Sequence, residues 1–472
     1  MKIILIALPL KTSKTTFESV EIAPLALYLL ASILKQQNHQ VSIIDPCEFL
    51  QFQNMDKIDE VCARYIEKQI IRRRAEAIAF SVNSFNWSNS KLAIDYIGAK
   101  YPYINITVGG LHATNFAKHV LEVSKAQVVI RGEGEKTIVD LYETLEKKGS
   151  LSEVRGITYK VSGKIYANVD NEPMSIYEMK QTPLPCFELL PENNSYTQMP
   201  VESSRGCHYS CVFCSIPHRH CWKGLDVDTV LERTKHAMKF KNAIKRNDFV
   251  LYVDDCFTAD CERAHKIFAE LEQLYGKSHK FFIEARITDI INGSILQKIP
   301  PEMISSMQIG VECGYDEGLK KIHKGLTIRQ LYEGIKIIQK YKYERHCFLS
   351  FIIGFPWETI DKINLTLDTI EEISSKYHIV CNLNWLLFLP SDLWSEKEKY
   401  NIYLEESIFD HSLWYGNSDY FFKSHPLISF DDILAVEKRV RVMQMKGPVG
   451  YRRSIGLEDD YKEPSSIKNI EN

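Results

Sequence analysis

Two series of alternating strand-like and helix-like segments run along the 472-residue chain, and they restrict its fold class to α/β. In the first series, short apolar runs are separated by stretches of helical apolar spacing, as at residues 24–36. Five such repeats with short connections predict a doubly wound parallel sheet, in which ligands sit at the carboxyl ends of the strands. The expected strands are residues 2–8, 41–45, 77–82, 104–108 and 128–130.

A second β/α series begins near residue 201, after a predicted hairpin at 156–168 and a proline-rich stretch at 171–200. About six β/α units predict a TIM barrel, complete or partial. The expected strands are residues 201–204, 249–253, 281–285, 306–311, 347–353 and 379–387. We therefore expect a Rossmann-like domain, a hairpin with a linker, a partial (β/α)6 barrel and a mixed C-terminal extension that could bind substrate. Their expected bounds are residues 1–150, 151–195, 196–395 and 396–472.

The composition is that of a globular protein and excludes several function classes. Hydrophobic residues make up 45% of the chain and charged residues 25%, with a formal net charge of −3. The chain therefore has no global basic footprint for nucleic acid. No apolar run reaches the roughly 18 residues needed to span a bilayer, and the N-terminus resembles a first strand more than a signal peptide. We expect a cytoplasmic protein without a transmembrane segment.

Three of the twelve cysteines fall within eight residues, at Cys207, Cys211 and Cys214, directly after a predicted strand. Three thiolates on one loop can bind three irons of a [4Fe–4S] cluster and leave the fourth iron free, whereas a closed structural zinc site needs four ligands. An iron without a protein ligand can chelate a substrate. The alternatives at this point are a zinc knuckle completed by Cys221 or His208, and three buried cysteines.

The Cys-x3-Cys-x2-Cys spacing, with an aromatic residue before the last cysteine, resembles the radical S-adenosylmethionine (SAM) superfamily. The resemblance covers residues 200–400. It implies that the free iron binds the amino and carboxylate groups of SAM. It also implies that the cluster, reduced by a flavodoxin- or ferredoxin-type donor, cleaves SAM to a 5′-deoxyadenosyl radical. Cys207, Cys211 and Cys214 would then be both metal ligands and catalytic residues.

Four further segments resemble the SAM-binding elements of that superfamily. The first is an Asp pair after the second barrel strand, which could instead cap the following helix. In another, Ile283-Glu284-Ala285-Arg286, two charged residues alternate and so share one face of a strand, where burial without a ligand is costly. The residues that the resemblance assigns to SAM are Asp254, Asp255, Glu284, Arg286, Glu312, Gly354 and Pro356.

A Rossmann-like domain ahead of such a barrel resembles the cobalamin-dependent branch of the superfamily. In that branch, strand-end loops hold the corrin ring and its nucleotide tail, and small residues let the backbone approach the ring. The residues implied are Ser81, Asn83, Gly109, Gly110, His112, Gly132, Glu133 and Gly134.

Two common motifs are missing from the first 150 residues. The Asp-x-His-x-x-Gly motif of many cobalamin-binding folds is missing, so the lower cobalt ligand is unassigned. His112 is expected to be a hydrogen-bonding loop residue near the corrin rather than a cobalt ligand. The Gly-x-Gly-x-x-Gly fingerprint at the first βα turn is also missing, which argues against a nicotinamide cofactor.

The resemblance implies methylation of an unactivated carbon. One SAM would methylate the cobalt, and a second would yield the radical that abstracts a substrate hydrogen before the methyl group is transferred. A cyclisation, ring rearrangement or oxidation on the same architecture is the alternative, with a non-catalytic cluster or cobalamin sensor more remote. The substrate class stays open between a peptide, a lipid and an antibiotic intermediate.

Several other residues have a plainer interpretation. Most of the remaining cysteines are expected to be small buried hydrophobes, whereas Cys313 could also donate a proton or hydrogen. The aromatic residues Tyr415, Tyr420 and Phe421 either line a substrate cavity or form a satellite core. Arg439 could grip an acidic substrate, but a solvated helix face is the expected setting.

Overall fold

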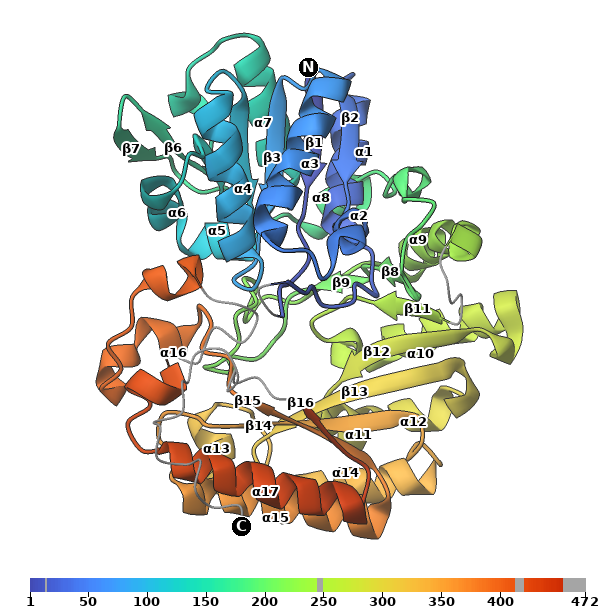
Figure 1. Cartoon of the computed structure of the whole chain (residues 1–472). Helices are drawn as coiled ribbons and strands as arrows, with labels where there is room; N and C mark the ends of the chain where they lie inside the picture. Colours follow the sequence, from blue (N-terminus) through green and yellow to red (C-terminus); the bar gives the residue numbers. More distant parts are fainter. Residues whose placement is uncertain (13–14, 244–248, 412–419, 453–472) are drawn as a thin grey trace.

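The computed structural model describes residues 1–12, 15–243, 249–411 and 420–452. Two α/β parts lie one above the other, and each is built around a mainly parallel sheet (Figure 1). The expected fold class is therefore confirmed. No helix within the described residues is both long and apolar enough to cross a bilayer.

The N-terminal sheet has the strand order β2-β1-β3-β4-β5-β6-β7. Its first five strands are parallel, and the order reverses between β1 and β3, as in a doubly wound fold. The predicted hairpin adds to β5 in antiparallel fashion, so it extends this sheet instead of linking two domains. The strands are β1 (Lys2–Ile6), β2 (Gln40–Ile44), β3 (Ala77–Ser81), β4 (Asn105–Gly109), β5 (Val128–Ile130), β6 (Ile157–Val161) and β7 (Lys164–Ala167).

The helices of this part pack in pairs, α1 beside α7 and α3 beside α4. The apolar spacing of α1 accounts for its position, because Leu27, Ala31 and Leu34 are all buried on one side of the helix. The helices are α1 (Leu25–Gln36), α2 (Pro46–Phe49), α3 (Ile58–Arg73), α4 (Trp87–Lys100), α5 (Leu111–Asn115), α6 (Ala117–Val123), α7 (Gly134–Glu146) and α8 (Ile176–Gln181).

The second sheet is wholly parallel, in the order β16-β15-β14-β13-β12-β11-β8, and in the described residues it stays open between its two edge strands. Its first strand lies three residues earlier than predicted and contains Pro200. An edge strand tolerates a proline, which cannot donate to a neighbour. The strands are β8 (Gln198–Val201), β11 (Phe249–Tyr252), β12 (Lys280–Ala285), β13 (Ile304–Glu312), β14 (Cys347–Ile353), β15 (Val380–Trp385) and β16 (Val449–Arg452), with a separate ribbon of β9 (Ser204–Arg205) and β10 (Lys223–Gly224).

The seventh strand, β16, was not predicted. It comes from the C-terminal extension and has only four residues, one of them Gly450, which leaves no apolar pattern to recognise. The expected domain bounds remain a prediction, although β16 and the hairpin each join a neighbouring sheet. The main helices of this part are α9 (Val227–Lys239), α10 (Cys261–Tyr275), α11 (Ile287–Gly293), α12 (Ile295–Lys298), α13 (Asp316–Lys321), α14 (Ile328–Lys340), α15 (Ile360–Tyr377), α16 (Asp392–Ser395) and α17 (Phe430–Lys446).

The C-terminal extension contacts both parts of the molecule. Asp410 accepts a hydrogen bond from the Trp87 indole at 2.7 Å and pairs with His119 at 3.0 Å. Tyr420 and Phe421 are buried against each other and form the satellite core that was one of the two expectations for them. Tyr415 and the last 20 residues lie outside the described residues. The extension thus connects the barrel part to helices α4 and α6 of the N-terminal part.

Candidate active site

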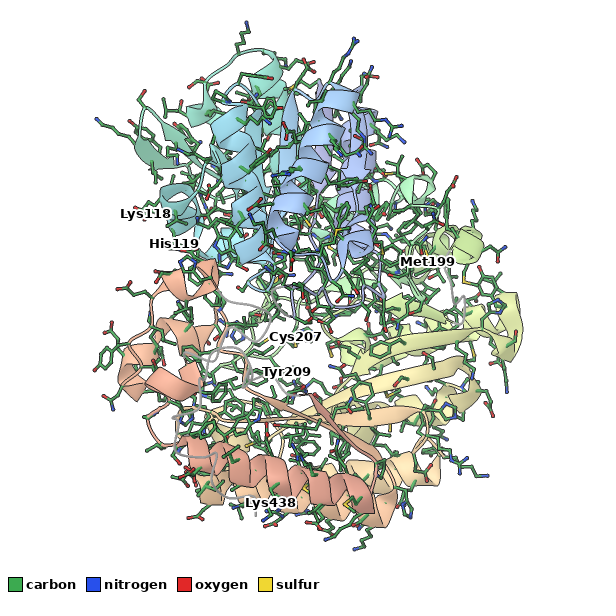
Figure 2. The ribbon with its side chains drawn as sticks, viewed as in Figure 1. Lys118, His119, Met199, Cys207, Tyr209 and Lys438 are labelled. Atoms are coloured by element: carbon green, nitrogen blue, oxygen red, sulfur yellow. The ribbon has the colours of Figure 1, made fainter. Side chains whose placement is uncertain are left out.

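The cysteine loop lies between the two parts of the molecule, where Figure 2 labels Cys207 and Tyr209. The Cys207 N–H donates to the His218 carbonyl at 3.1 Å, which closes the loop. Gly206 has a φ of +86°, and a Cβ at this position would lie 2.2 Å from the Cys221 carbonyl oxygen. Only glycine therefore fits directly before the first cysteine.

The three thiols of this loop are free of disulfide bonds but differ in acidity. A hydrogen bond from Cys256, assisted by a backbone N–H and the Arg286 charge, lowers the pKa of Cys207 to about 6. Burial raises the pKa of Cys214 to about 11. Three free thiols on one loop fit the donor set of a [4Fe–4S] cluster by their chemistry and spacing. Among the described residues, no three His, Cys, Asp or Glu side chains are gathered closely enough to hold a metal ion.

The Asp pair after β11 supports this loop. Asp254 is buried and accepts hydrogen bonds from the Ser203 N–H at 2.7 Å and the Ser203 hydroxyl at 2.5 Å. Asp255 accepts one from the Gly206 N–H at 2.8 Å. Neither caps the next long helix, α10, because its N-cap is Asp260. The structure thus shows Asp254 and Asp255 holding the segment that leads into the cysteine loop, and their contact with SAM stays a prediction.

Glu284 lies on β12, whereas Arg286 directly follows the last residue of that strand and is the N-cap of α11. The Arg286 guanidinium lies 3.4 Å from the centroid of the Tyr209 ring, and its Nε is buried without a partner in the described residues. Burial, together with the charges of neighbouring carboxylates, raises the pKa of Glu284 to about 8. Such incompletely satisfied polar groups fit a ligand that carries charged and hydroxyl groups, as SAM does.

Glu312 ends β13 in a conformation that is unusual for a residue with a side chain. Its φ is +74°, and its carboxylate pairs with the buried Lys324 ammonium at 2.8 Å. Strained backbone of this kind persists where the surroundings fix it, often at functional sites. The Glu312–Lys324 pair lies close enough to Glu284 for both charges to influence the pKa of that carboxyl.

Gly354 and Pro356 lie in the turn after β14, which is organised by a carboxyl that the sequence analysis did not assign to the site. The fully buried Glu358 accepts hydrogen bonds from the Gly354 N–H at 2.7 Å and the Tyr315 hydroxyl at 3.0 Å. Burial raises the pKa of Glu358 to about 7. Its place after Gly-x-Pro was visible in the sequence, but its contacts depend on the fold.

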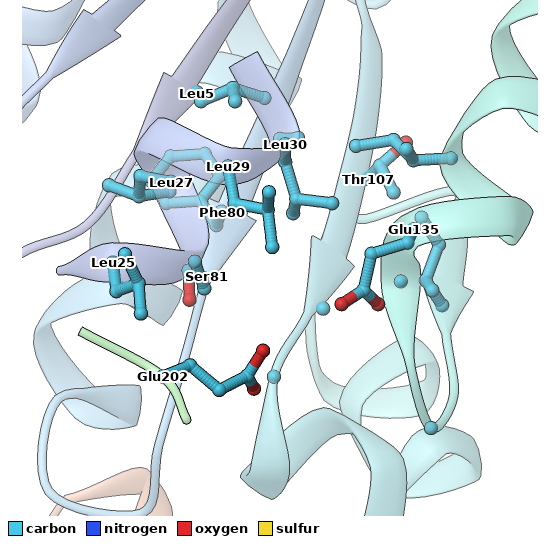
Figure 3. Close-up of a pocket in the computed structure, with 18 of the residues that line it drawn as sticks. Leu5, Leu25, Leu27, Leu29, Leu30, Phe80, Ser81, Thr107, Glu135 and Glu202 are labelled. Atoms are coloured by element: carbon cyan, nitrogen blue, oxygen red, sulfur yellow. The ribbon is translucent and has the colours of Figure 1, made fainter. Parts of the chain in front are cut away.

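A cavity of about 340 Å³ opens at the carboxyl ends of the N-terminal strands. Figure 3 shows the leucines of one wall, with the carboxylates of Glu135 and Glu202 on the other side. Gly110 has a φ of +100°, and a Cβ there would lie 2.4 Å from the Val82 carbonyl oxygen. The lining includes Leu25, Leu29, Leu30, Phe80, Ser81, Gly109, Gly110, Gly132 and Gly134, with Glu202, Arg205 and Val253 from the barrel part.

This cavity fits part of a large flat cofactor, because its inner wall is apolar and its glycines expose backbone. Three of the expected corrin contacts, Asn83, His112 and Glu133, do not line it. The Asn83 carboxamide accepts from the N–H groups of Phe85 and Asn86 and so shapes the turn after β3. Glu133 instead accepts from Arg205 and from the Met174 N–H, both at 2.5 Å.

His112 lies away from the lining of this cavity, and its contact with a corrin stays a prediction. Its ring is fully buried, stacks on Trp87 with centroids 5.1 Å apart, and meets the edges of Phe116 and Phe409. Its Nδ1 lies 3.1 Å from the Ser84 hydroxyl. Burial lowers the pKa of His112 to about 3, so the ring is neutral and belongs to an aromatic core.

Two family models match the chain in the order that the fold suggests. The B12 binding domain model matches residues 19–142, and the Radical SAM superfamily model matches residues 201–370. The chain is a cobalamin-dependent radical SAM enzyme. The family uses a [4Fe–4S] cluster, SAM and cobalamin, which replaces the zinc and buried-cysteine alternatives.

Curated relatives of this radical SAM enzyme carry different names. An uncharacterised methyltransferase of Pyrococcus horikoshii is 28% identical over 80% of this chain and 79% of its own length. Hopanoid C-3 methylase of Methylococcus capsulatus is 25% identical over 67% and 58%. The 4′-phospho-dehydrooxetanocin synthase of Priestia megaterium is 25% identical over 58% and 40%. The chain therefore spans less than two thirds of the last two relatives.

Solved structures share the fold. The cobalamin-dependent radical enzyme OxsB with aqua-cobalamin bound has a TM-score of 0.64 at 21% identity, covering 93% of this chain and 61% of that one. The methyltransferase TsrM from Kitasatospora setae, with cobalamin and a [4Fe–4S] cluster bound, has a TM-score of 0.65 at 12% identity, covering 85% and 79%. Both combine the two parts found in this radical SAM enzyme.

Proposed function

We propose that the chain is a C-methyltransferase that acts on an unactivated carbon. The observation that supports this most is the relative named a methyltransferase that matches four fifths of the chain. Hopanoid C-3 methylase, a second relative, adds to it. The geometry is compatible, because residues of the barrel part, Glu202, Arg205 and Val253, form part of the wall of the N-terminal cavity.

In this proposal each cofactor is held by residues of matching chemistry. The thiolates of Cys207, Cys211 and Cys214 hold the cluster. Arg286, Glu284 and the Glu312–Lys324 pair bind SAM through their charged groups. The glycine-walled cavity takes part of the corrinoid, with Gly109, Gly110, Gly132 and Gly134 in its lining.

When bound, the cofactors would supply a radical able to abstract a substrate hydrogen and a methyl group for transfer. The chain's own share is placement. Asp254 and Asp255 hold the cysteine loop, and Tyr209 stacks on Arg286 to fix the guanidinium. The Trp87 ring stacks on His112 and donates to Asp410, which joins the N-terminal part to the C-terminal extension.

The ratio of the two SAM products tests the reaction. The anaerobic enzyme would be supplied with SAM, a reducing donor of the flavodoxin or ferredoxin type, and candidate substrates of the peptide, lipid and antibiotic-intermediate classes. C-methylation predicts one S-adenosylhomocysteine for each 5′-deoxyadenosine, and a product heavier by one CH2 group. Deoxyadenosine alone, with a product lacking that mass, would contradict methylation.

The second candidate is a non-methylating reaction, such as a cyclisation, ring rearrangement or oxidation. It is favoured by one specific observation, the similarity to 4′-phospho-dehydrooxetanocin synthase over 300 residues. The same experiment separates the two candidates, since this reaction would form 5′-deoxyadenosine without S-adenosylhomocysteine. No turnover of SAM with any donor would instead favour the sensor alternative.

A further inference from the structure

Arg205 stands two residues before Cys207, yet its side chain reaches away from the cysteine loop to the N-terminal part. Its guanidinium contacts Glu133 at 2.5 Å and Glu135 at 3.0 Å, both near the start of α7. It also contacts Glu202, at the end of β8, at 2.8 Å. The Arg205 side chain is only 14% exposed. One buried cation therefore joins carboxylates from both parts of the molecule.

The charges around Arg205 make this contact necessary for local neutrality. The side chains of Glu133, Glu135 and Glu202 are 10 to 16% exposed, so each needs a compensating partner. Arg233 supplies a second cation, but it contacts only Glu202 among the three, at 3.1 Å. Removing Arg205 would leave Glu133 and Glu135 buried without their guanidinium partner. Loss of one partner from a buried ion pair strongly destabilises the charges that remain.

The side chain and the backbone of Arg205 each lead to one of the two proposed cofactor sites. Its side chain, with Glu135 and Glu202, lines the glycine-walled cavity. Its backbone continues through Gly206, whose N–H is held by Asp255, into Cys207. We propose that Arg205 is a positioning residue that fixes the corrinoid cavity at a set distance from the cluster loop. This inference rests on the cofactor placement proposed above, but not on methylation being the reaction.

The chemistry of arginine suits this role. A guanidinium is planar, carries five N–H donors and can serve several carboxylates at once, whereas a lysine ammonium is a point charge on a flexible stem. A reaction that needs two cofactors and a substrate together depends on how closely the protein places the reacting atoms. A displacement of about 1 Å can reduce the rate by about 100-fold.

The test measures the magnetic interaction between the two cofactors in the full chain. The protein would be loaded with cob(II)alamin and a reduced cluster, both paramagnetic, and examined by electron paramagnetic resonance. We expect a clear interaction in the wild type, a weakened or heterogeneous one in Arg205→Met, and an intermediate one in Arg205→Lys. Arg233→Met is the matched control, because Arg233 is equally buried and contacts Glu202 but not α7. It should match the wild type.

A second pair of substitutions keeps the test valid if Arg205→Met fails to fold. Glu133→Gln with Glu135→Gln removes the N-terminal side of the contact and leaves the cysteine loop unchanged. We expect iron content equal to the wild type and the same loss of interaction. With substrate, 5′-deoxyadenosine should then form in excess over the final product. SAM would still be cleaved, but fewer of the cleavage events would lead to product.

Three results would overturn the inference in distinguishable ways. If both variants keep full cofactor content and the wild-type interaction, Arg205 does not set the spacing. If Arg233→Met loses the interaction as fully as Arg205→Met, the effect belongs to Glu202 and not to the contact with α7. If the wild type binds both cofactors but shows no interaction at all, the proposed cofactor placement fails and this inference fails with it.

Discussion

The carboxyl ends of the strands of both sheets face a common region, but the residues at those ends differ in type between the two sheets. The N-terminal sheet offers glycines and the leucines of α1 around a cavity. The barrel sheet offers thiols, Arg286 and the buried Glu312–Lys324 pair. We therefore expect a large, mostly neutral ring to be bound by shape and backbone access in the N-terminal part, and a small charged cofactor to be bound by charged side chains in the barrel part.

This contrast predicts that the two regions fail differently when altered. Binding in the N-terminal cavity should be sensitive to added side-chain volume and insensitive to pH. Binding in the barrel part should be sensitive to the removal of charged groups and to their protonation. The following substitutions address one region or the other, in order of expected effect.

The largest effect is expected for Gly110→Val in the N-terminal cavity. The substitution adds a Cβ 2.4 Å from the Val82 carbonyl oxygen, at a backbone φ of +100°. To relieve the clash and the strained φ, the backbone itself would have to move. We expect the free energy of unfolding of this part to fall by about 2–5 kcal/mol and corrinoid affinity to fall at least about tenfold. Corrinoid titration and chemical denaturation measure both.

Gly163→Ala is the matched control for Gly110→Val. Gly163 also has a positive φ, of +79°, but it lies at the hairpin turn with nothing within 4 Å of an added Cβ. It should cost about 1 kcal/mol and leave corrinoid binding unchanged. Equal losses of affinity in the two variants would show that backbone strain matters and the shape of the cavity does not.

The next effect is expected for Asp254→Asn on the barrel side. The buried carboxylate accepts hydrogen bonds from the Ser203 N–H, the Ser203 hydroxyl and the Ser204 hydroxyl. In the variant, the NH2 group of asparagine would face one or more of these donors. We expect a loss of about 2–4 kcal/mol in unfolding free energy, with reduced iron retention. Asp260→Asn at the N-cap of α10 should change stability by only a few tenths of a kcal/mol, because asparagine caps equally well. Equal iron retention in the two variants would argue against the positioning role of Asp254.

A smaller, pH-dependent effect is expected for Glu284→Gln in protein without SAM. The pKa of Glu284 is about 8 in the folded state, above its ordinary value, so folding favours the protonated form. The wild type should therefore lose stability as pH rises from about 4.5 to 8, whereas the variant lacks this contribution. Unfolding free energies at pH 6 and 8.5 measure the difference, which should favour the variant more at the higher pH. Parallel profiles would contradict the assigned burial.

The smallest effect is expected for Arg439→Ala. Arg439 on α17 donates to Asn364 and pairs with Asp368 and Glu371 on the neighbouring α15, away from both cofactor regions. Such surface pairs contribute less than about 1 kcal/mol. We expect unchanged cofactor content and product ratio. A specific loss of substrate turnover would revive the role in gripping an acidic substrate.

Much of the fold followed from local pattern, because buried parallel strands and amphipathic helices leave strong periodic signals. The cysteine loop was equally clear, since its ligands are adjacent in sequence. Contacts that depend on distant segments were not predictable. His112 looked like a loop residue, yet it is stacked beneath Trp87 and closed over by Phe409 from the C-terminal extension.

The same limit explains the other differences. Glu133 was predicted to contact a ligand because it lies in a glycine-rich loop. In the structure its carboxylate accepts a hydrogen bond from Arg205, about 70 residues later in the chain. The seventh strand, β16, is too short to show a pattern and is placed by pairing with β15. Burial that arises from tertiary contacts is therefore the part of this site that the sequence analysis could not supply.

The most direct test of the account is the iron and corrinoid content of anaerobically reconstituted protein, compared between the two regions. We predict about four irons and one corrinoid per chain in the wild type. The variant with Cys207, Cys211 and Cys214 all changed to Ala should lose the iron and keep the corrinoid, whereas Gly110→Val should lose the corrinoid and keep the iron. Wild-type protein that takes up iron but no corrinoid, or a cysteine variant that still holds four irons and cleaves SAM, would contradict it.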